Sequence, residues 1–192
     1  MLRLKRDLLP SFLLCLACRR LVGGSNWRGW IERLRIYYLL MVADAPPVRW
    51  NDLKRFSILR SDNSLSKLLG RMINDNYLDK LSKTYTITDE GMEDYELLLK
   101  SLNHYVLAIL EMYLSEFPEC RYLREYAQRC QRFDMSFYKH AIMRFDSLDS
   151  YLVNLAKTTS RKEEISQEKA LANMCYGIED ILDKPIRELC GK

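Results

Sequence analysis

Glycine, proline and histidine are all scarce in this chain. It has 7 Gly, 5 Pro and 2 His among 192 residues, so long stretches contain no residue that interrupts a helix. This composition excludes a turn-rich β-sandwich and favours a mainly helical fold. Hydrophobic residues make up 48% and charged residues 29% of the chain, which excludes intrinsic disorder and indicates a globular protein.

Sequence patterns typical of enzymes are missing as well. The two histidines, His104 and His140, each stand alone in a helical segment. The chain contains no Ser-His-Asp order, no Gly-rich phosphate loop and no paired-carboxylate pattern. We therefore expect no enzymatic activity, no bound metal ion and no cofactor.

Cysteines are scattered through helical segments rather than concentrated in a short, loop-rich chain. This distribution favours mostly reduced thiols in a cytoplasmic protein over a secreted disulfide scaffold. Cys15 and Cys18 form a C-x-x-C pair, but no second pair follows at metal-binding spacing. We interpret this pair as small residues of a helix, with a zinc or redox site as the alternative. The cysteines are Cys15, Cys18, Cys120, Cys130, Cys175 and Cys190.

The N-terminal segment allows two interpretations. A basic stretch, residues 1–7, precedes an apolar run over residues 8–17, as in a secretory signal peptide. The same run has leucines and Phe12 at near-helical spacing, which predicts a packed helix. It is too short to span a membrane, which takes about 20 residues. We expect a packed helix and a loop over residues 1–30, because the rest of the chain is typical of a cytoplasmic protein.

Charge is distributed unevenly along the chain. Residues 1–86 contain 16 Lys and Arg against 7 Asp and Glu, whereas residues 87–192 contain 14 against 19. A basic first part followed by an acidic second part indicates that the first part faces a polyanion. We favour nucleic acid as this polyanion, although a membrane surface would give the same charge signal.

The sequence pattern of residues 31–102 predicts three helices, a β-hairpin and the start of a longer helix. The third helix has the clearest pattern, because Ser61-Asp62-Asn63 supplies N-cap chemistry and apolar residues recur at i, i+3, i+4, i+7 and i+8 from Leu65. Thr88 caps the longer helix, and acidic residues occupy its first turn. The predicted elements are a helix from 31 that ends before Pro46, helices 50–56 and 62–75, strands 77–81 and 84–88, and a helix over 92–117.

Residues 103–192 are predicted to form a helical C-terminal region. Beyond the helix that ends at Phe117, we expect helices at about 121–130, 136–157 and 166–189. A polar connection is expected at 161–164. The chain contains no internal repeat and no low-complexity tract.

Two segments, Leu65–Leu78 and Tyr85–Gly91, resemble the winged-helix regulators of the PadR and MarR type. In those families a recognition helix ends in a Gly-containing step, and a strand then leads into a Thr-x-x-Gly turn. Here Asn76-Tyr77-Leu78 replaces the Gly step, whereas Thr88 and Gly91 fit the turn. The resemblance implies a mainly α, winged helix-turn-helix fold with three helices and a two-strand β-wing. It also implies a homodimer paired through the long helix after the wing.

The exposed face of the third helix suits the major groove of DNA. This face presents short hydrogen-bonding residues and two cations without a carboxylate. Asn and Arg side chains can read bases, while Ser and Lys suit phosphates. Gly70 would let a DNA backbone approach closely, and the hairpin would touch phosphates or the minor groove. Arg49 and Lys54 could add phosphate contacts. The candidate DNA-binding residues are Asn63, Ser64, Ser66, Lys67, Gly70, Arg71 and Asn74 of the helix, Lys80, Ser82 and Lys83 of the hairpin, and Arg55 and Arg60 before the helix.

These features predict a cytoplasmic transcriptional regulator that binds double-stranded DNA as a homodimer. Helix 62–75 would enter the major groove and wing 79–85 would lie on the backbone. An unidentified small-molecule effector in the C-terminal region would fit this class. The chief alternative is a winged helix that serves as a protein–protein interaction module in a larger complex. The interpretation as a membrane-attached regulator is supported by residues 8–17 alone, and we do not expect a membrane partner.

Overall fold

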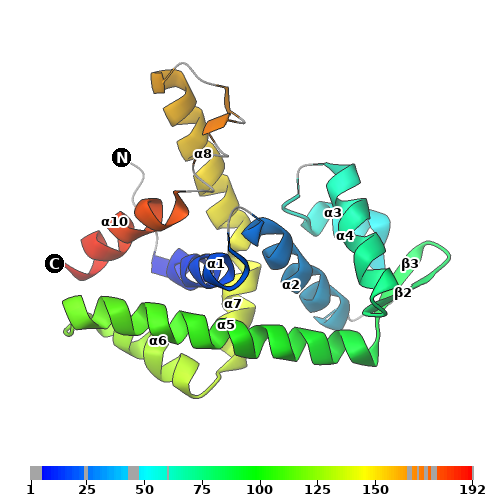
Figure 1. Cartoon of the computed structure of the whole chain (residues 1–192), viewed down its shortest axis with the longest axis horizontal. Helices are drawn as coiled ribbons and strands as arrows, with labels where there is room; N and C mark the ends of the chain where they lie inside the picture. The colour runs from blue at the N-terminus through cyan, green and yellow to red at the C-terminus, as the bar shows by residue number, and fades with distance from the viewer. Residues whose placement is uncertain are drawn as a thin grey trace. The chain divides into compact units, whose positions relative to one another are not determined.

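The computed structural model describes residues 6–23, 26–42, 48–59, 61–163, 166–167, 169–170, 173 and 177–191. The protein is mainly helical with one small antiparallel sheet, which confirms the expected mainly α class (Figure 1). The chain packs as two compact units. The central unit is Arg28–Ser101, and the terminal unit combines Met1–Trp27 with Leu102–Lys192.

The central unit contains the elements that the sequence predicts between residues 31 and 102. The predicted short helix is present over Trp50–Phe56, and the helix predicted at 62–75 is present over Asp62–Asn74. In chain order the unit contains α2 (Trp27–Val42, from Arg28 onward), β1 (Val48–Arg49), α3 (Trp50–Phe56), α4 (Asp62–Asn74), β2 (Leu78–Leu81), β3 (Thr84–Ile87) and the first part of α5 (Asp89–Glu116).

Both ends of α4 are fixed by local hydrogen bonds. The Ser61 hydroxyl accepts a hydrogen bond from the Ser64 N–H at 3.1 Å, which satisfies a donor in the first turn. At the other end Asn76 adopts a φ of 61°, and the Tyr77 N–H donates to the Met72 carbonyl at 2.8 Å. Asn tolerates this left-handed conformation, so it can replace the glycine of the resembled families. The apolar stripe of α4 is buried: Leu65, Leu68, Leu69 and Met72.

The hairpin belongs to a three-stranded sheet, so the prediction of two strands omitted one strand. Strands β2 and β3 pair antiparallel across a turn at Ser82 and Lys83. Strand β1 pairs with the other edge of β3 and places Val48 opposite Tyr85. Because side chains alternate along a strand, Val48 is buried and Arg49 is exposed. The additional strand therefore carries Arg49 to the hairpin.

Buried charged side chains of α2 fix the turn between α3 and α4. Glu32 and Arg35 are only 1% and 0% exposed. The Ile58 N–H donates to Glu32 Oε2 at 2.9 Å, and Arg35 Nη2 donates to the Phe56 carbonyl at 2.5 Å. The Arg35 guanidinium also lies 4.1 Å from the centroid of the Phe56 ring. Since buried charges are stable only with partners, these bonds hold the turn in one conformation.

The turn at Thr88–Gly91 joins the start of α5 to the end of α4. The Thr88 hydroxyl accepts from the Gly91 N–H at 3.0 Å and donates to the Asn76 carbonyl at 2.7 Å. A Cβ atom on Gly91 would lie 2.1 Å from the Tyr77 carbonyl oxygen. No side chain fits in this space, so the Thr-x-x-Gly pattern has a packing cause: α5 begins against the backbone that leaves α4.

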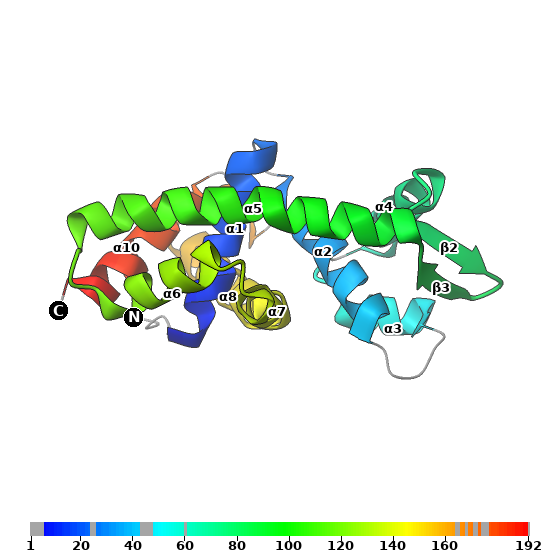
Figure 2. The ribbon, with the colours of Figure 1, turned by 90° about the horizontal axis from the view of Figure 1, so that it is seen from below.

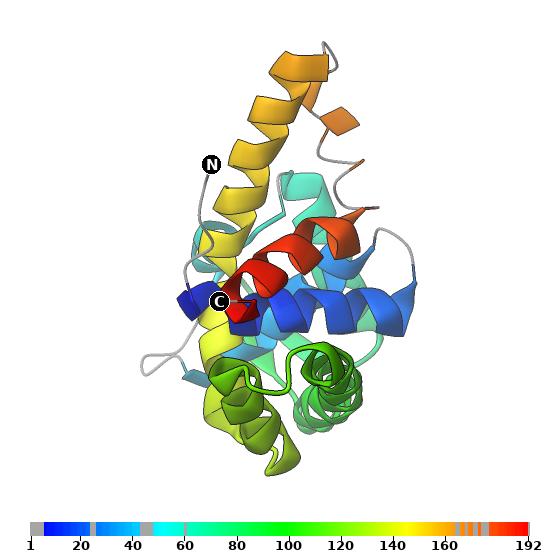
Figure 3. The ribbon, with the colours of Figure 1, turned by 90° about the vertical axis from the view of Figure 1, so that its left-hand side faces the viewer.

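The terminal unit packs around α1. Residues 9–18 of α1 are all buried, which confirms a packed helix in the apolar N-terminal run. Helix α1 packs against α7, α8 and α10, so the N-terminal segment packs with the C-terminal helices (Figure 3). None of the helices within the described residues combines the length and apolar composition needed to cross a membrane. The unit contains η1 (Arg6–Leu8), α1 (Leu9–Val22), the rest of α5, α6 (Arg121–Gln131), α7 (Met135–Met143), α8 (Phe145–Glu163) and α10 (Ile178–Cys190).

Two helical ranges in the terminal unit differ from the prediction. The helix predicted at 136–157 is divided at Arg144 into α7 and α8. Helix α8 then continues to Glu163, so most of the polar connection predicted at 161–164 is helical, and residue 164 lies outside the described residues. The final predicted helix, 166–189, is described as α10 from Ile178 onward.

The cysteines do not all share one state. Cys120 and Cys190 form a disulfide bond, so the expectation of reduced thiols does not hold for this pair. Cys15, Cys18 and Cys130 are buried, and burial raises the pKa of the Cys18 thiol. Within the described residues, no group of three or more His, Cys, Asp and Glu side chains is arranged to hold a metal ion. Cys175 lies outside those residues.

Candidate nucleic-acid interface

A cleft of about 580 Å³ lies in the central unit between α4, the β2–β3 hairpin and the start of α3. Figure 2 shows α3 and α4 on either side of the hairpin. Three separate stretches of sequence contribute to the cleft, and the sheet brings them together. Its lining consists of Arg49, Trp50, Asn51, Ser66, Leu69, Gly70, Ile73, Lys80, Ser82, Lys83 and Tyr85.

The lining residues carry positive charge without any carboxylate. Arg49, Lys80 and Lys83 supply the cations, and all three are exposed. Lys80 Nζ lies 5.6 Å from the centroid of the Tyr85 ring, a cation–π contact that restricts the lysine beside the hairpin. Concave surfaces lined by one sign of charge concentrate the electrostatic field and attract ions of the opposite sign. The cleft therefore suits a phosphate-bearing ligand.

Five of the predicted DNA-binding residues line this cleft. Ser66 and Gly70 come from α4, while Lys80, Ser82 and Lys83 come from the hairpin. The other predicted residues on α4 are exposed but lie outside the cleft lining: Asn63, Ser64, Lys67, Arg71 and Asn74.

The basic residues that precede α4, which were predicted to contact DNA, differ in their position relative to the cleft. Arg55 is exposed on α3 and does not line the cleft, and Arg60 lies outside the described residues. Lys54 forms an ion pair with Asp62 at 2.8 Å, so part of its charge is neutralised within the protein. Arg49, which the sequence suggested only as an added phosphate contact, is the cation that β1 places in the cleft.

Sequence reasoning did not select Trp50, Asn51 and Tyr85 as functional residues. All three line the cleft because β1 pairs with β3 and places the first turn of α3 beside the hairpin. A two-residue strand has no periodicity that a sequence pattern can reveal. The available signal was composition alone, since Arg49 and Trp50 stand together at the start of a short helix with exposed polar residues.

Gly70 is unusual for its position inside α4. Glycine in a helix interior lowers stability by about 0.5–1 kcal/mol relative to alanine. A Cβ atom at Gly70 would meet no heavy atom within 4 Å, so the packing of the chain does not require a glycine. Gly70 lines the cleft, so a ligand there could approach the backbone of α4 closely.

Comparison with protein-family models, curated proteins and solved structures gives no match to this chain. The functional conclusion therefore depends on the chemistry of the cleft and of the exposed face of α4. The resemblance to winged-helix regulators depends on residues 65–78 and 85–91.

Proposed function

We propose that this protein binds double-stranded DNA through α4, the hairpin and the start of α3, and that it regulates transcription. The observation that carries the proposal is a cationic cleft without carboxylates, formed beside a helix whose exposed residues from 63 to 74 also include no carboxylate. In this arrangement α4 is the recognition helix of a winged helix-turn-helix and the β2–β3 hairpin is its wing.

The dimensions and chemistry of both elements agree with this assignment. The major groove of B-DNA admits an α-helix, and Asn, Ser and Arg side chains can hydrogen-bond to base edges there. The exposed Asn63, Arg71 and Asn74 belong to these residue types. Lys80 and Lys83 on the hairpin would contact phosphates and fix the position of the helix along the duplex.

The Gly70→Ala substitution should separate folding from binding. We expect it to stabilise the central unit by about 0.5–1 kcal/mol, because alanine is the better helix former and open space surrounds the position. We expect the same substitution to weaken DNA binding by about tenfold, because a methyl group would stand where the duplex approaches. Chemical denaturation and DNA titration measure the two effects. Unchanged DNA affinity would contradict a close approach at Gly70.

A homodimer would place two recognition helices on successive turns of the major groove. Within the central unit, the α5 side chains Met92 and Leu97 are 42% and 63% exposed. Large apolar side chains left on a long helix are suitable for pairing with a second copy. Sedimentation should therefore detect a dimer at micromolar concentration, and a strict monomer would contradict this part of the proposal.

Duplex binding across a range of salt concentrations tests the proposed function. Fluorescence anisotropy would follow labelled duplexes that carry the protein's own upstream region or an unrelated sequence. If Lys67, Arg71, Lys80 and Lys83 contact phosphates, log affinity should fall with log salt with a slope of about −3.6, from about −0.9 per phosphate. Tighter binding to the upstream duplex would support sequence-specific regulation. The absence of binding at low salt would overturn the proposal.

One observation favours a protein–protein interaction module as the second candidate. Leu81, beside the turn of the hairpin, is 71% exposed, and the neighbouring Asp79 is also exposed. An apolar side chain next to a carboxylate suits a protein partner better than a phosphate backbone. This candidate predicts no salt-dependent binding to any duplex.

A further inference from the structure

Helix α10 is joined to the rest of the terminal unit by a covalent bond. Cys190 is the last residue of α10, and its sulfur is bonded to that of Cys120, which lies 70 positions earlier and directly before α6. Helix α10 lies along α1 (Figure 3). Among the α10 residues whose exposure is described, only Ile186 is buried. The partly buried Ile181 also packs against Ala156 and Ala170, so the described apolar attachment of α10 depends mainly on two isoleucines.

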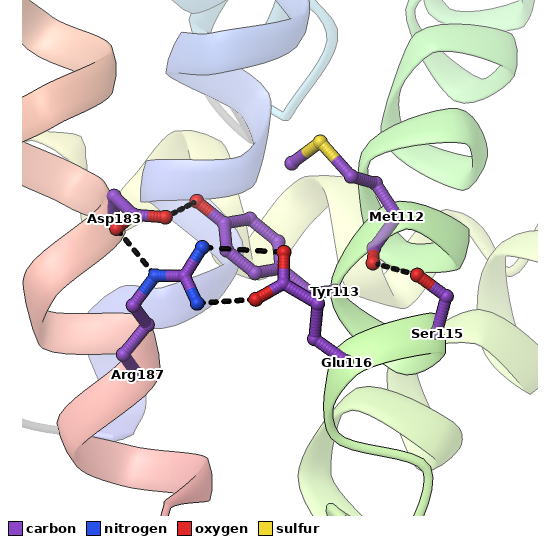
Figure 4. Close-up of polar contacts among 6 residues, drawn as sticks. All are labelled: Met112, Tyr113, Ser115, Glu116, Asp183 and Arg187. Carbon is purple, nitrogen blue, oxygen red and sulfur yellow. Dashed lines mark hydrogen bonds and ion pairs between the residues drawn. The ribbon is translucent and has the colours of Figure 1, made fainter.

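The polar attachment of α10 is also weak. Figure 4 shows that Arg187 contacts Glu116 of α5 through two ion-paired hydrogen bonds and Asp183 through a third, at 2.6 Å. The Tyr113 hydroxyl donates to Asp183 Oδ1 at 3.0 Å. The side chains of Arg187, Glu116 and Asp183 are 43%, 42% and 37% exposed. Ion pairs this accessible contribute little to stability and weaken as salt rises.

We infer that Cys120 and Cys190 form a reversible thiol–disulfide site whose redox state determines how firmly α10 is held. The co-reactants are of the glutathione class: a small thiol opens the bond, and its disulfide closes it. This inference does not depend on DNA binding. It follows from a disulfide that joins Cys120 to the end of a helix whose described residues have few other attachments.

The two cysteine residues differ in exposure and in electrostatic surroundings. Cys190 is half-buried near the C-terminus, whereas Cys120 is only 6% exposed. An attacking thiolate therefore reaches the Cys190 sulfur and displaces the Cys120 sulfur. Cys120 is the N-cap residue of α6, where free backbone N–H groups stabilise negative charge on a departing thiolate.

The exchange is balanced in atoms and electrons. One thiolate of reduced glutathione bonds to Cys190 Sγ as the bond to Cys120 breaks, and Cys120 takes up a proton. A second glutathione thiolate attacks the glutathione sulfur of this mixed disulfide and releases Cys190, which is also protonated. Two thiols of glutathione are oxidised to one glutathione disulfide, and the protein disulfide is reduced to two thiols. Oxidation runs through the same steps in reverse.

The other described thiols cannot readily take part. Cys15, Cys18 and Cys130 are each 0% exposed. A thiol without access to solvent reacts slowly with a small disulfide, because thiol–disulfide exchange requires direct contact between sulfur atoms. The redox change should therefore be selective for the Cys120–Cys190 pair among these residues.

Redox titration of the full-length protein tests this inference. The protein would be equilibrated in mixtures of reduced and oxidised glutathione at a total of about 5 mM, then alkylated and analysed by peptide mass spectrometry. We expect the Cys120–Cys190 link to open and close reversibly within these mixtures. Amide hydrogen exchange over residues 178–190 should be at least about tenfold faster in the reduced protein. Exchange in α7 should change little.

Two variants provide the controls. Cys190→Ser should show the fast α10 exchange of the reduced protein in every glutathione mixture. In the oxidised protein, Arg187→Gln should leave amide exchange of α10 slow, because the disulfide still holds the helix. In the reduced protein, the variant should exchange faster than the unaltered chain, because the ion pairs of Arg187 then hold the helix without the disulfide. The inference is overturned if the bond stays closed in reduced glutathione alone, if it never forms in glutathione disulfide, or if α10 exchanges equally in both states.

Discussion

Replacement of Lys80 and Lys83 together by glutamate is expected to weaken duplex DNA binding by about 100-fold or more at physiological salt. Both lysines line the cleft together with Arg49, and the lining residues include no carboxylate. The double variant removes two phosphate contacts and sets two negative charges against the duplex. The slope of log affinity against log salt should become shallower by about 2.

The matched control for this variant is Lys139→Glu combined with Lys157→Glu. These lysines are exposed on α7 and α8 of the terminal unit, so the control makes the same change in net charge. We expect the control to bind DNA within about threefold of the unaltered protein, because neither lysine lines the cleft and exposed charges outside a binding site are screened by salt. Equal losses in both double variants would mean that net charge, and not the cleft, determines binding.

The Gly91→Ala substitution should give the largest loss of stability, about 3 kcal/mol in the central unit. The added methyl group would lie 2.1 Å from the Tyr77 carbonyl oxygen and 2.9 Å from Ile87 Cγ1. Because the first of these atoms belongs to the backbone, relief requires α5 to move away from the end of α4. That movement would also stretch the hydrogen bonds of Thr88 to Gly91 and Asn76. Chemical denaturation followed by near-ultraviolet circular dichroism measures the loss.

Gly70→Ala is the control for Gly91→Ala, since it makes the same chemical change at a helical position in open space. The two substitutions should change the free energy of unfolding in opposite directions. A Gly91→Ala variant as stable as the unaltered protein would contradict the close contact with Tyr77. Because the chain packs as two compact units, the comparison should use the unfolding transition reported by probes in the central unit.

Local chemistry made several elements of the central unit predictable from sequence. The apolar stripe from Leu65 and the N-cap at Ser61 predicted α4, because capping and periodicity act within a few residues. The hairpin turn at Ser82 and Lys83 and the cap at Thr88 were predictable for the same reason. Each of these signals lies within the element that it specifies.

Features that depend on long-range packing could not be predicted in this way. Strand β1 is only Val48–Arg49, and it forms because β3 offers a free edge. The break at Arg144 is invisible in the apolar spacing, since Ile142 and Phe145 are both buried and continue one helical pattern. The bond between Cys120 and Cys190 joins residues that only the folded terminal unit brings together.

The candidate site also combines residues that local sequence predicts with an arrangement that depends on long-range packing. The cations of the hairpin and the small residues of α4 were predicted from residue type and exposure. Their assembly with Arg49, Trp50 and Asn51 into a cleft depends on the three-stranded sheet, which the sequence did not predict. Conversely, Lys54 is basic in sequence but forms an ion pair with Asp62.

The central claim is that the cleft face of the central unit contacts duplex DNA. Amide chemical shifts of the full-length protein, recorded during titration with an unlabelled duplex, test it most directly. If the cleft face contacts DNA, we expect saturable shifts in α4, in the hairpin residues 79–85 and at Arg49–Asn51. Saturable shifts confined to the terminal unit, or no shifts at low salt, would contradict it.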